Sequence, residues 1–171
     1  MRLVRNLILF IVALYIGVIL FMPKSQLYYF GEKQLKKYGV VIGNEELNSG
    51  LASLEILHPV AYYQGVDILR ATNVKIIPLL FINKLEADSV ELLNVAKKFV
   101  DIEITKLKLN ESILKPYRVK IDATGNFGIA NGYADLKSRI LHIDIIKPKD
   151  INSIKRYLKK GDKGWYYESK F

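Results

Sequence analysis

A single apolar stretch near the start of the chain limits what this sequence can fold into. Leu7 to Met22 is a run of 16 residues without a charge, which as an α-helix would be roughly 24 Å long. The hydrocarbon core of a bilayer is about 30 Å thick, and Leu3 and Val4 can lengthen the helix. The run is apolar on every face, whereas a core helix carries polar residues on one face. We therefore expect a transmembrane anchor over residues 1–23.

The residues at the two ends of the apolar run indicate whether the anchor is cleaved and how it is oriented in the membrane. Leu20 to Pro23 offers no small residues of the kind that a signal peptidase requires, so we expect an uncleaved, single-pass anchor. A short basic tail with Arg2 and Arg5 before the run is typical of a signal anchor that leaves the C-terminal domain outside. The lysines that follow the run favour the opposite orientation by the positive-inside rule. We favour the first orientation.

Charge is concentrated at the end of the chain. The 171 residues carry a net charge of +9, and the segment from Lys147 onward holds eight Lys or Arg against three Asp or Glu. Such a segment can meet an acidic partner or an anionic membrane, or it can be solvated surface. No nucleic-acid-binding module accompanies it, so we expect no nucleic-acid partner. The chain has no cysteine, which excludes disulfides and thiolate metal sites.

After the anchor, the spacing of the apolar residues changes once. Residues 24–39 fit a short helix that Ser25 caps and Gly39 ends. From Val40 the apolar period is about 2, which predicts an antiparallel, curved β-sheet domain over residues 40–147 in a mainly β protein. The expected strands are residues 39–42, 51–58, 61–64, 66–70, 74–83, 85–93, 100–109, 117–124, 127–136 and 140–146. Residues 84–98 also fit a helix, and a change of face within 100–109 predicts a bulge near Thr105.

Two of these strands suggest a groove. Residues 74–83 carry apolar groups on both faces around Pro78, as in a strand buried on both sides or one whose second face lines an apolar groove. Residues 127–136 have one face of small residues, which admits a backbone, a helix or an acyl chain, close packing being the commoner use. The candidate groove residues are Ile76, Leu80, Ile82, Gly128, Ala130, Gly132 and Ala134.

The C-terminal residues 148–171 have a different pattern. Asp150 and Gly161 fit the two ends of an amphipathic helix, and an aromatic tail follows that is either a docking peptide or disordered. The apolar stripe of the helix can pack on the sheet, which is the commoner use, or the helix can lie on an anionic membrane. The candidate membrane or partner surface consists of Lys155, Arg156, Lys159, Lys160 and Trp165.

Catalytic and metal-binding patterns are weak in this sequence. His58 and His142 lie far apart in the chain without a carboxylate at ligand spacing. Asp101 and Glu103 share one strand face, where a solvated surface explains them more simply than an acid–base pair. Phosphate-binding and nucleophile motifs are absent from the sequence. We expect neither an enzyme nor a cofactor.

Several short motifs carry a family resemblance. Leu54-Glu55-Ile56 leads to Gly65-Val66-Asp67-Ile68 and then to Ile77-Pro78-Leu79-Leu80 with Asn83-Lys84-Leu85. Later motifs are Ala123-Thr124-Gly125 and Gly132-Tyr133-Ala134-Asp135-Leu136. Together with the anchor, this order resembles the type II secretion system protein N and AsmA-like group.

The resemblance implies a non-enzymatic protein of the bacterial inner membrane whose β domain is periplasmic. One hypothesis is an accessory component of a secretion or envelope assembly that acts through protein contacts. The alternative is a lipid-binding or lipid-transfer module with an apolar groove. Empty apolar space inside the sheet would favour the alternative, and a core filled by side chains would exclude it.

Overall fold

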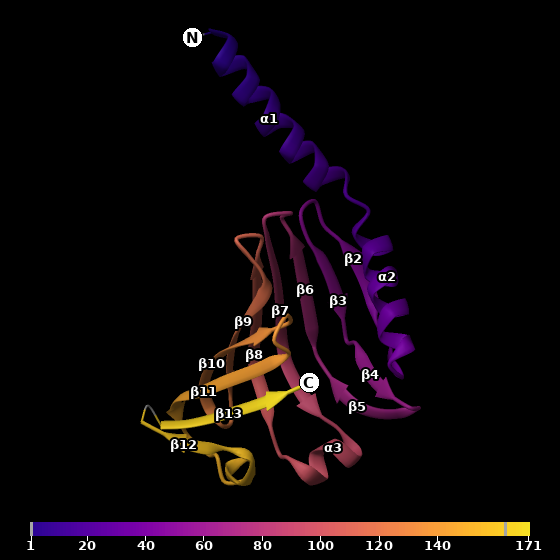
Figure 1. The fold of residues 1–171 in the computed structure, drawn as a ribbon. Helices are drawn as coiled ribbons and strands as arrows, with labels where there is room; N and C mark the ends of the chain where they lie inside the picture. Colours follow the sequence, from indigo (N-terminus) through magenta and orange to yellow (C-terminus); the bar gives the residue numbers. More distant parts are fainter. Residues whose placement is uncertain (1, 163) are drawn as a thin grey trace.

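The fold is a long N-terminal helix joined to an open, curved antiparallel sheet (Figure 1). The computed structural model describes residues 2–162 and 164–171. Helix α1, Arg2–Phe21, extends away from the sheet, and helix α2, Lys24–Lys37, lies against it. The length and apolar composition of α1 are sufficient to cross a membrane. The predicted mainly β fold with an N-terminal apolar helix is thus confirmed.

The two helices are separated because Pro23 interrupts the helical hydrogen-bond ladder. Pro23 occupies the N-cap position of α2, and Ser25, the predicted cap, instead forms a hydrogen bond with the Ser49 hydroxyl (2.9 Å). The C-terminal end is as predicted: Gly39 has a φ of +79°, the left-handed conformation in which glycine ends a helix.

Within the described residues, thirteen strands and one further α-helix, α3 (Asn94–Phe99), follow α2. The strands are β1 (Val40–Gly43), β2 (Glu46–Ser49), β3 (Leu54–Leu57), β4 (Val60–Tyr63), β5 (Val66–Arg70), β6 (Asn73–Pro78), β7 (Ile82–Leu92), β8 (Glu103–Ser112), β9 (Lys115–Gly125), β10 (Gly128–Asp135), β11 (Ile140–Pro148), β12 (Lys159–Gly161) and β13 (Gly164–Lys170).

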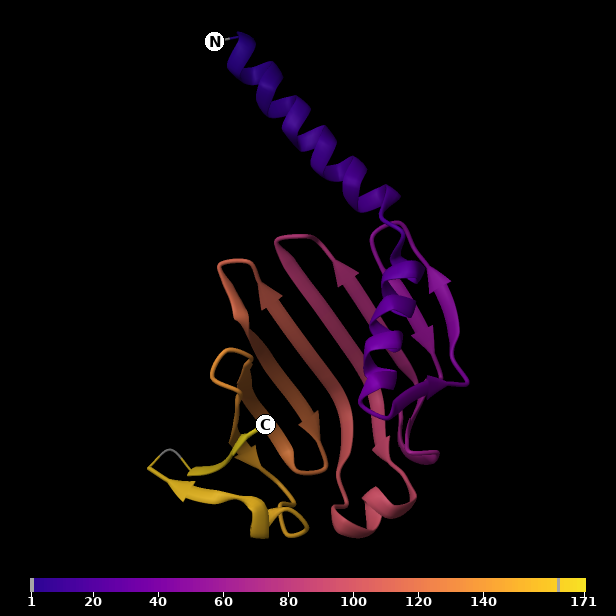
Figure 2. The same ribbon diagram turned by 45° about the vertical axis from the view of Figure 1, so that its right-hand side comes forward.

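The sheet branches at β7. The main path runs β1-β4-β5-β7-β8-β9-β10-β11-β13-β12, and β6, β3 and β2 form a second branch. β7 pairs with β6 over Asn83–Asp88 and with β5 only at Glu91 and Leu92. Figure 2 shows that the strands curve around one concave side, over which α2 lies.

A bulge in β8 keeps the concave face apolar. Ile104 pairs with Gly125 while Lys106 pairs with Thr124, so Thr105 is the extra residue, as predicted. The extra residue brings Ile104 and Leu107 to the same face, although their spacing in the sequence places them on opposite faces.

The small residues of β10 allow neighbouring strands to approach closely. A Cβ added to Gly132 would collide with the carbonyl oxygen of His142 on β11. Beyond β10 the strands β11 and β13 cross the direction of β7 and β8 at a steep angle (Figure 1). Close packing against a backbone is therefore the role of Gly132 in the fold.

The expected helix over residues 150–160 is wrong. The segment forms turns and a 3₁₀ turn, Lys155–Tyr157, and then strand β12. Asp150 accepts a hydrogen bond from the N–H of Asn152 (3.2 Å), which caps a turn rather than a helix. A helix this short is marginal by itself, and pairing of β12 with β13 supplies the competing backbone hydrogen bonds. The aromatic tail is β13, paired with β11, and it belongs to the same sheet.

The predicted strand 74–83 also needs correction. β6 ends at Pro78, residues 79–81 form a turn, and β7 begins at Ile82. The alternative helix over residues 84–98 is wrong for most of its length, because β7 continues to Leu92. Pro78 lies beyond the part of β6 that pairs with β3, so its missing N–H leaves that ladder intact.

Candidate apolar ligand-binding groove

The concave face of the sheet is apolar across eight successive strands. Residues at matched register positions form two rows that run from β3 to β13. The first row is Leu54, Ile76, Leu85, Leu109, Ile121, Gly132, Ile143 and Tyr167, and the second is Ile56, Val74, Ala87, Leu107, Ala123, Ala130, Ile145 and Trp165. At the usual strand spacing the rows extend roughly 34 Å along the curve. We call this face the groove.

The convex face has the opposite character. One cross-strand row on this face alternates in charge: Glu55, Lys75, Glu86, Lys108 and Asp122. Lys75 Nζ lies 2.7 Å from Glu55 Oε1, and this carboxylate raises the pKa of Lys75. The alternation predicts cross-strand attraction in water, so the convex face is the solvated one.

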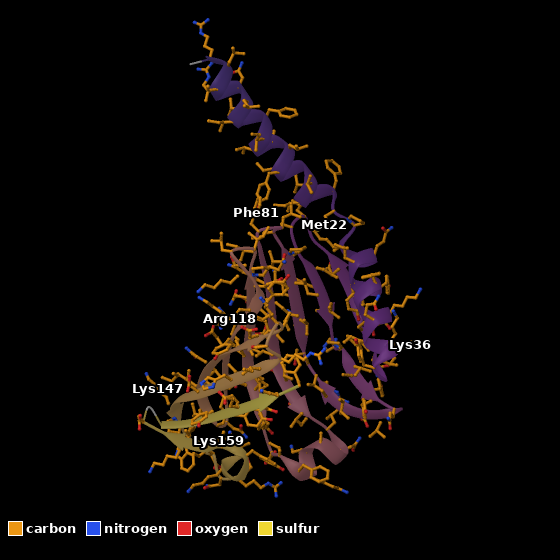
Figure 3. The ribbon with its side chains drawn as sticks, in the orientation of Figure 1. Met22, Lys36, Phe81, Arg118, Lys147 and Lys159 are labelled. Carbon is orange, nitrogen blue, oxygen red and sulfur yellow. The ribbon has the colours of Figure 1, made fainter. Side chains whose placement is uncertain are left out.

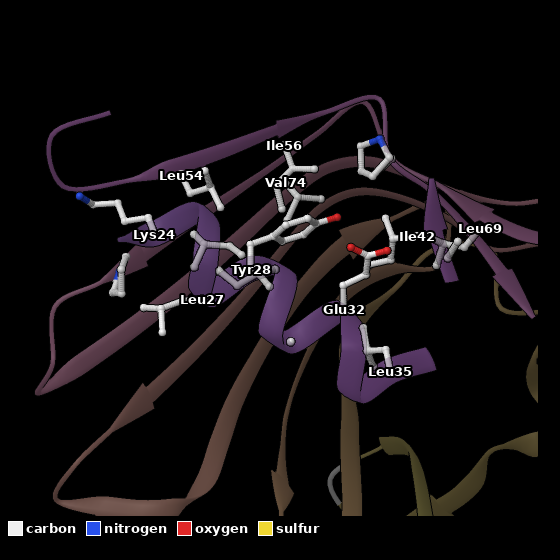
Figure 4. A pocket seen from close by; sticks show the side chains of 17 residues that line it. Lys24, Leu27, Tyr28, Glu32, Leu35, Ile42, Leu54, Ile56, Leu69 and Val74 are labelled. Carbon is white, nitrogen blue, oxygen red and sulfur yellow. The ribbon is translucent and has the colours of Figure 1, made fainter. Parts of the chain in front are cut away.

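A first pocket lies between α2 and the groove (Figure 4). Its volume is about 390 Å³, within the usual range of ligand pockets of about 300–1,000 Å³. The Tyr28 ring of α2 points toward Ile56 and Val74, and Leu54 beneath it is only 2% exposed. The side chains of α2 cover this pocket without filling it.

Few polar groups border the first pocket. The Tyr28 hydroxyl donates to Glu45 Oε1 (3.2 Å), and burial together with that carboxylate raises the pKa of Tyr28 far above its usual value. Lys24, in the first turn of α2, is buried and lies at one end of the pocket (Figure 4). The pocket therefore offers an apolar interior with a cation at one end.

A second pocket lies at the end of the sheet away from α1. Its volume is about 440 Å³, and strands β8 to β11 form its floor. Val100 and Ile102 border it on one side, and Ile154 and Leu158 of the segment before β12 cover it. The covering segment packs through apolar side chains, although it is not a helix.

A cluster in the middle of the sheet connects the two pockets. Ala71, Ala87 and Val90 are its buried members. Leu85, which lines the first pocket, and Leu107, which lines the second, both pack against it. The groove is therefore one continuous apolar surface with space above it at each end.

The predicted groove residues differ in whether they line a pocket. Ile76 lines the first pocket and Ala130 lines the second. Gly132 and Ala134 lie on the same face of β10 as Ala130, but neither borders a pocket. Gly128 has a φ of +108° and faces the Lys147 carbonyl, so a side chain is excluded there by the backbone of β11.

Leu80 and Ile82 lie elsewhere. Both are exposed at the turn between β6 and β7, and neither borders the pockets. The prediction failed because it treated residues 74–83 as one strand, whereas the turn after Pro78 reverses the chain.

The residues of the predicted basic surface do not share a helical face. Arg156 donates to the carbonyl of Phe99 (2.6 Å), Lys155 lies over the Trp165 ring (5.4 Å), and Lys159 and Lys160 are in β12. Figure 3 shows Lys159 at the end of the molecule opposite Met22, where α1 ends. This surface is therefore remote from the bilayer that α1 would cross.

Most of the groove could not be predicted from the sequence. Leu85, Leu107, Ile121 and Ile145 each lie on an apolar strand face that alternation reveals, but alternation does not give the strand register that aligns these faces. Tyr28 lies within the predicted helix over residues 24–39, whose period does not show which strands it covers.

One group of side chains on the convex face has the residue types that acid–base chemistry uses. His142 lies 3.3 Å from Asp144 and 3.0 Å from Glu168, and its ring stacks between Tyr133 and Tyr166. Neither pocket includes His142. Within residues 2–162 and 164–171, no group of three or more His, Cys, Asp or Glu side chains is arranged to hold a metal ion. The groove remains the candidate site.

Comparison of the chain with family models, with curated proteins and with solved structures finds no match.

Proposed function

We propose that this protein is a membrane-anchored lipid-binding protein that holds acyl chains in its groove and catalyses no reaction. The observation that carries the proposal is the continuous apolar concave face with open space at each end. A dry core would have filled that space with side chains. Several groove residues, among them Leu109 and Ile121, are only half-buried, and an apolar ligand would complete their burial.

The anchor places the groove next to its ligand source. Only Met22 and Pro23 separate α1 from α2, the helix that covers the first pocket. In this proposal α1 crosses the bacterial inner membrane once and the sheet lies on the periplasmic side. A reporter fused after Phe171 should then be active only outside the cytoplasm; activity confined to the cytoplasm would overturn this location.

Lipid retention tests the binding function. The full chain, extracted from membranes in mild detergent, should retain phospholipid in native mass spectra. Gly31→Phe adds a ring on α2 at the first pocket, where a Cβ on Gly31 would meet no atom within 4 Å. We expect this variant to retain less lipid, because the ring competes for the same apolar space.

Lys36→Phe is the matched control, because Lys36 is exposed on the same helix and does not line the pocket. It should retain as much lipid as the unmodified chain. Equal lipid retention in all three proteins would contradict lipid binding in the first pocket.

A second function is favoured by the sheet edges. In the described part of the chain, β2 pairs only with β3 and β12 only with β13, so one side of each strand is available to another chain. This suits an accessory component of a secretion or envelope assembly. Gently solubilised membranes should then yield the protein together with envelope proteins, and recovery of the free monomer alone would count against this function.

A further inference from the structure

The sheet has three turns at the end nearest α1. Residues 50–53 join β2 to β3, residues 79–81 join β6 to β7, and residues 113–114 join β8 to β9. Figures 1 and 2 both show these turns at the end of the sheet nearest α1, with the turn at residues 50–53 closest to the C-terminal end of that helix. We call them the rim turns.

The composition of the second and third rim turns is unusual for hairpin connections. Residues 79–81 are Leu-Leu-Phe and residues 113–114 are Ile-Leu, whereas turns ordinarily use Gly, Asn, Asp and Pro. Leu114 is 88% exposed, Leu51 79% and Phe81 54%. The turn between β4 and β5, which points away from α1, is Gln64-Gly65 and follows the ordinary rule.

Direct contacts with α1 fix the position of the second rim turn along that helix. The Tyr15 hydroxyl donates to the carbonyl of Leu79 (2.8 Å), and the Tyr15 and Phe81 rings stack with centroids 5.4 Å apart. Tyr15 lies six residues before the end of α1 at Phe21, which is about 9 Å along the helix. The turn at residues 79–81 therefore lies beside the last part of α1 and not below it.

The third rim turn is held close to the second. The N–H of Ile113 donates to the carbonyl of Phe81 (2.9 Å), which joins the two turns. Exposed Lys84 follows the second rim turn by three residues and exposed Lys115 follows the third directly, where anionic headgroups would meet them. An aromatic and aliphatic rim with lysines behind it is the arrangement of proteins that insert into a membrane surface.

We propose that the rim turns insert into the surface of the bilayer that α1 crosses, so that the sheet is held by two attachments. The partner of this surface is the lipid bilayer itself. The proposal rests on α1 crossing the bilayer, which is part of the proposed function, but it does not require lipid in the groove. Insertion would hold the first pocket against the membrane and fix the tilt of the sheet.

The absence of cysteine makes a direct test possible. Leu51→Cys and Leu114→Cys, each labelled with an environment-sensitive fluorophore in the full chain, are reconstituted in vesicles of phosphatidylethanolamine and phosphatidylglycerol. We expect blue-shifted emission that nitroxide-labelled lipids quench severalfold more than aqueous iodide does. Phe99→Cys is the matched control, because Phe99 is also apolar and 61% exposed but lies in α3 at the opposite end.

Resistance to alkaline extraction, measured on the same vesicles, reports on α1 separately. If the chain resists extraction while the labels at positions 51 and 114 are as accessible to iodide as the label at position 99, the rim proposal is overturned and the anchor stands. If alkali extracts the chain, both fail. Lipid-quenched labels at positions 51 and 114 beside an iodide-quenched label at position 99 support the proposal.

Discussion

The two pockets of the groove are built from the same sheet face but are covered in different ways. The first is covered by α2, a regular helix that follows α1 almost directly. The second is covered by the segment before β12, whose backbone forms turns and a single 3₁₀ turn. The first cover is joined directly to α1, and the second is tied only to the sheet.

The two pockets also differ in their distance from α1. The first pocket begins at the end of the sheet nearer α1, with buried Lys24 at that end, and under the proposed function it would receive a lipid from the bilayer. The second pocket is more remote from α1, so under the same proposal a lipid bound there would have left the bilayer surface. The central cluster around Ala87 supplies the apolar path between them.

The largest expected effect is on the core beneath the first pocket. Leu54→Ala removes a side chain that is 2% exposed and should lower the free energy of unfolding by about 2–5 kcal/mol. Leu51→Ala, in the adjoining turn, is the control, and its effect should stay within about 0.5 kcal/mol because Leu51 is exposed. Denaturant unfolding in detergent measures both, and equal losses would contradict the described core.

A smaller effect is expected where β10 approaches β11. Gly132→Ala forces a Cβ against the His142 carbonyl and should destabilise the protein by about 1–3 kcal/mol. Gly31→Ala, in α2, meets no atom within 4 Å and should stabilise it by about 0.5–1 kcal/mol, because alanine favours the helix. Opposite shifts in melting temperature would support the close approach of β10 and β11; shifts of the same sign would contradict it.

The packing of α2 on the sheet should weaken at alkaline pH. Burial and the Glu45 carboxylate raise the pKa of Tyr28, so the neutral phenol favours the folded state. The resulting stabilisation is complete below the ordinary tyrosine pKa of about 10 and is lost as the pH rises through the folded pKa. The melting temperature should therefore fall more steeply above about pH 10 for the unmodified chain than for Tyr28→Phe. Parallel curves would show that Tyr28 has the same pKa in the folded and the unfolded chain, and would contradict the raised pKa in the folded protein.

The smallest effect is expected at the β10–β11 turn, and it has the opposite pH dependence. Hydrogen bonds from Ser138, assisted by Arg118, lower the pKa of Asp135. Its contribution to stability is present above the unfolded pKa of about 3.9 and is lost as the pH falls through the folded pKa. Asp135→Ala should lower the melting temperature slightly at neutral pH and less in acid; a loss that grows in acid would contradict this sign.

Local patterns predicted the elements whose signals are contained in one segment. The apolar run predicted α1, and alternation predicted an antiparallel sheet, including the bulge at Thr105. These features depend on the side chains of one strand or helix and on their period.

Features that depend on two distant segments were not predicted. Strand register, which aligns Leu85 with Leu109 and Ile121, has no local signal. The C-terminal helix failed for a different reason, because the hairpin of β12 with β13 supplies backbone hydrogen bonds that compete with a helix. The turn at residues 79–81 was hidden because its side chains are as apolar as those of the strands beside it.

Crosslinking in the second pocket shows most directly whether the groove binds lipid, because bilayer lipids around α1 do not reach that pocket. Leu107 lines it, and neighbouring Lys108 points to the convex face. A photoreactive amino acid is placed at each position in turn in the full chain, and membranes containing labelled phospholipid are irradiated. We expect lipid adducts at position 107 and none at position 108. No adduct at position 107, or equal adducts at both positions, would contradict a lipid-binding groove.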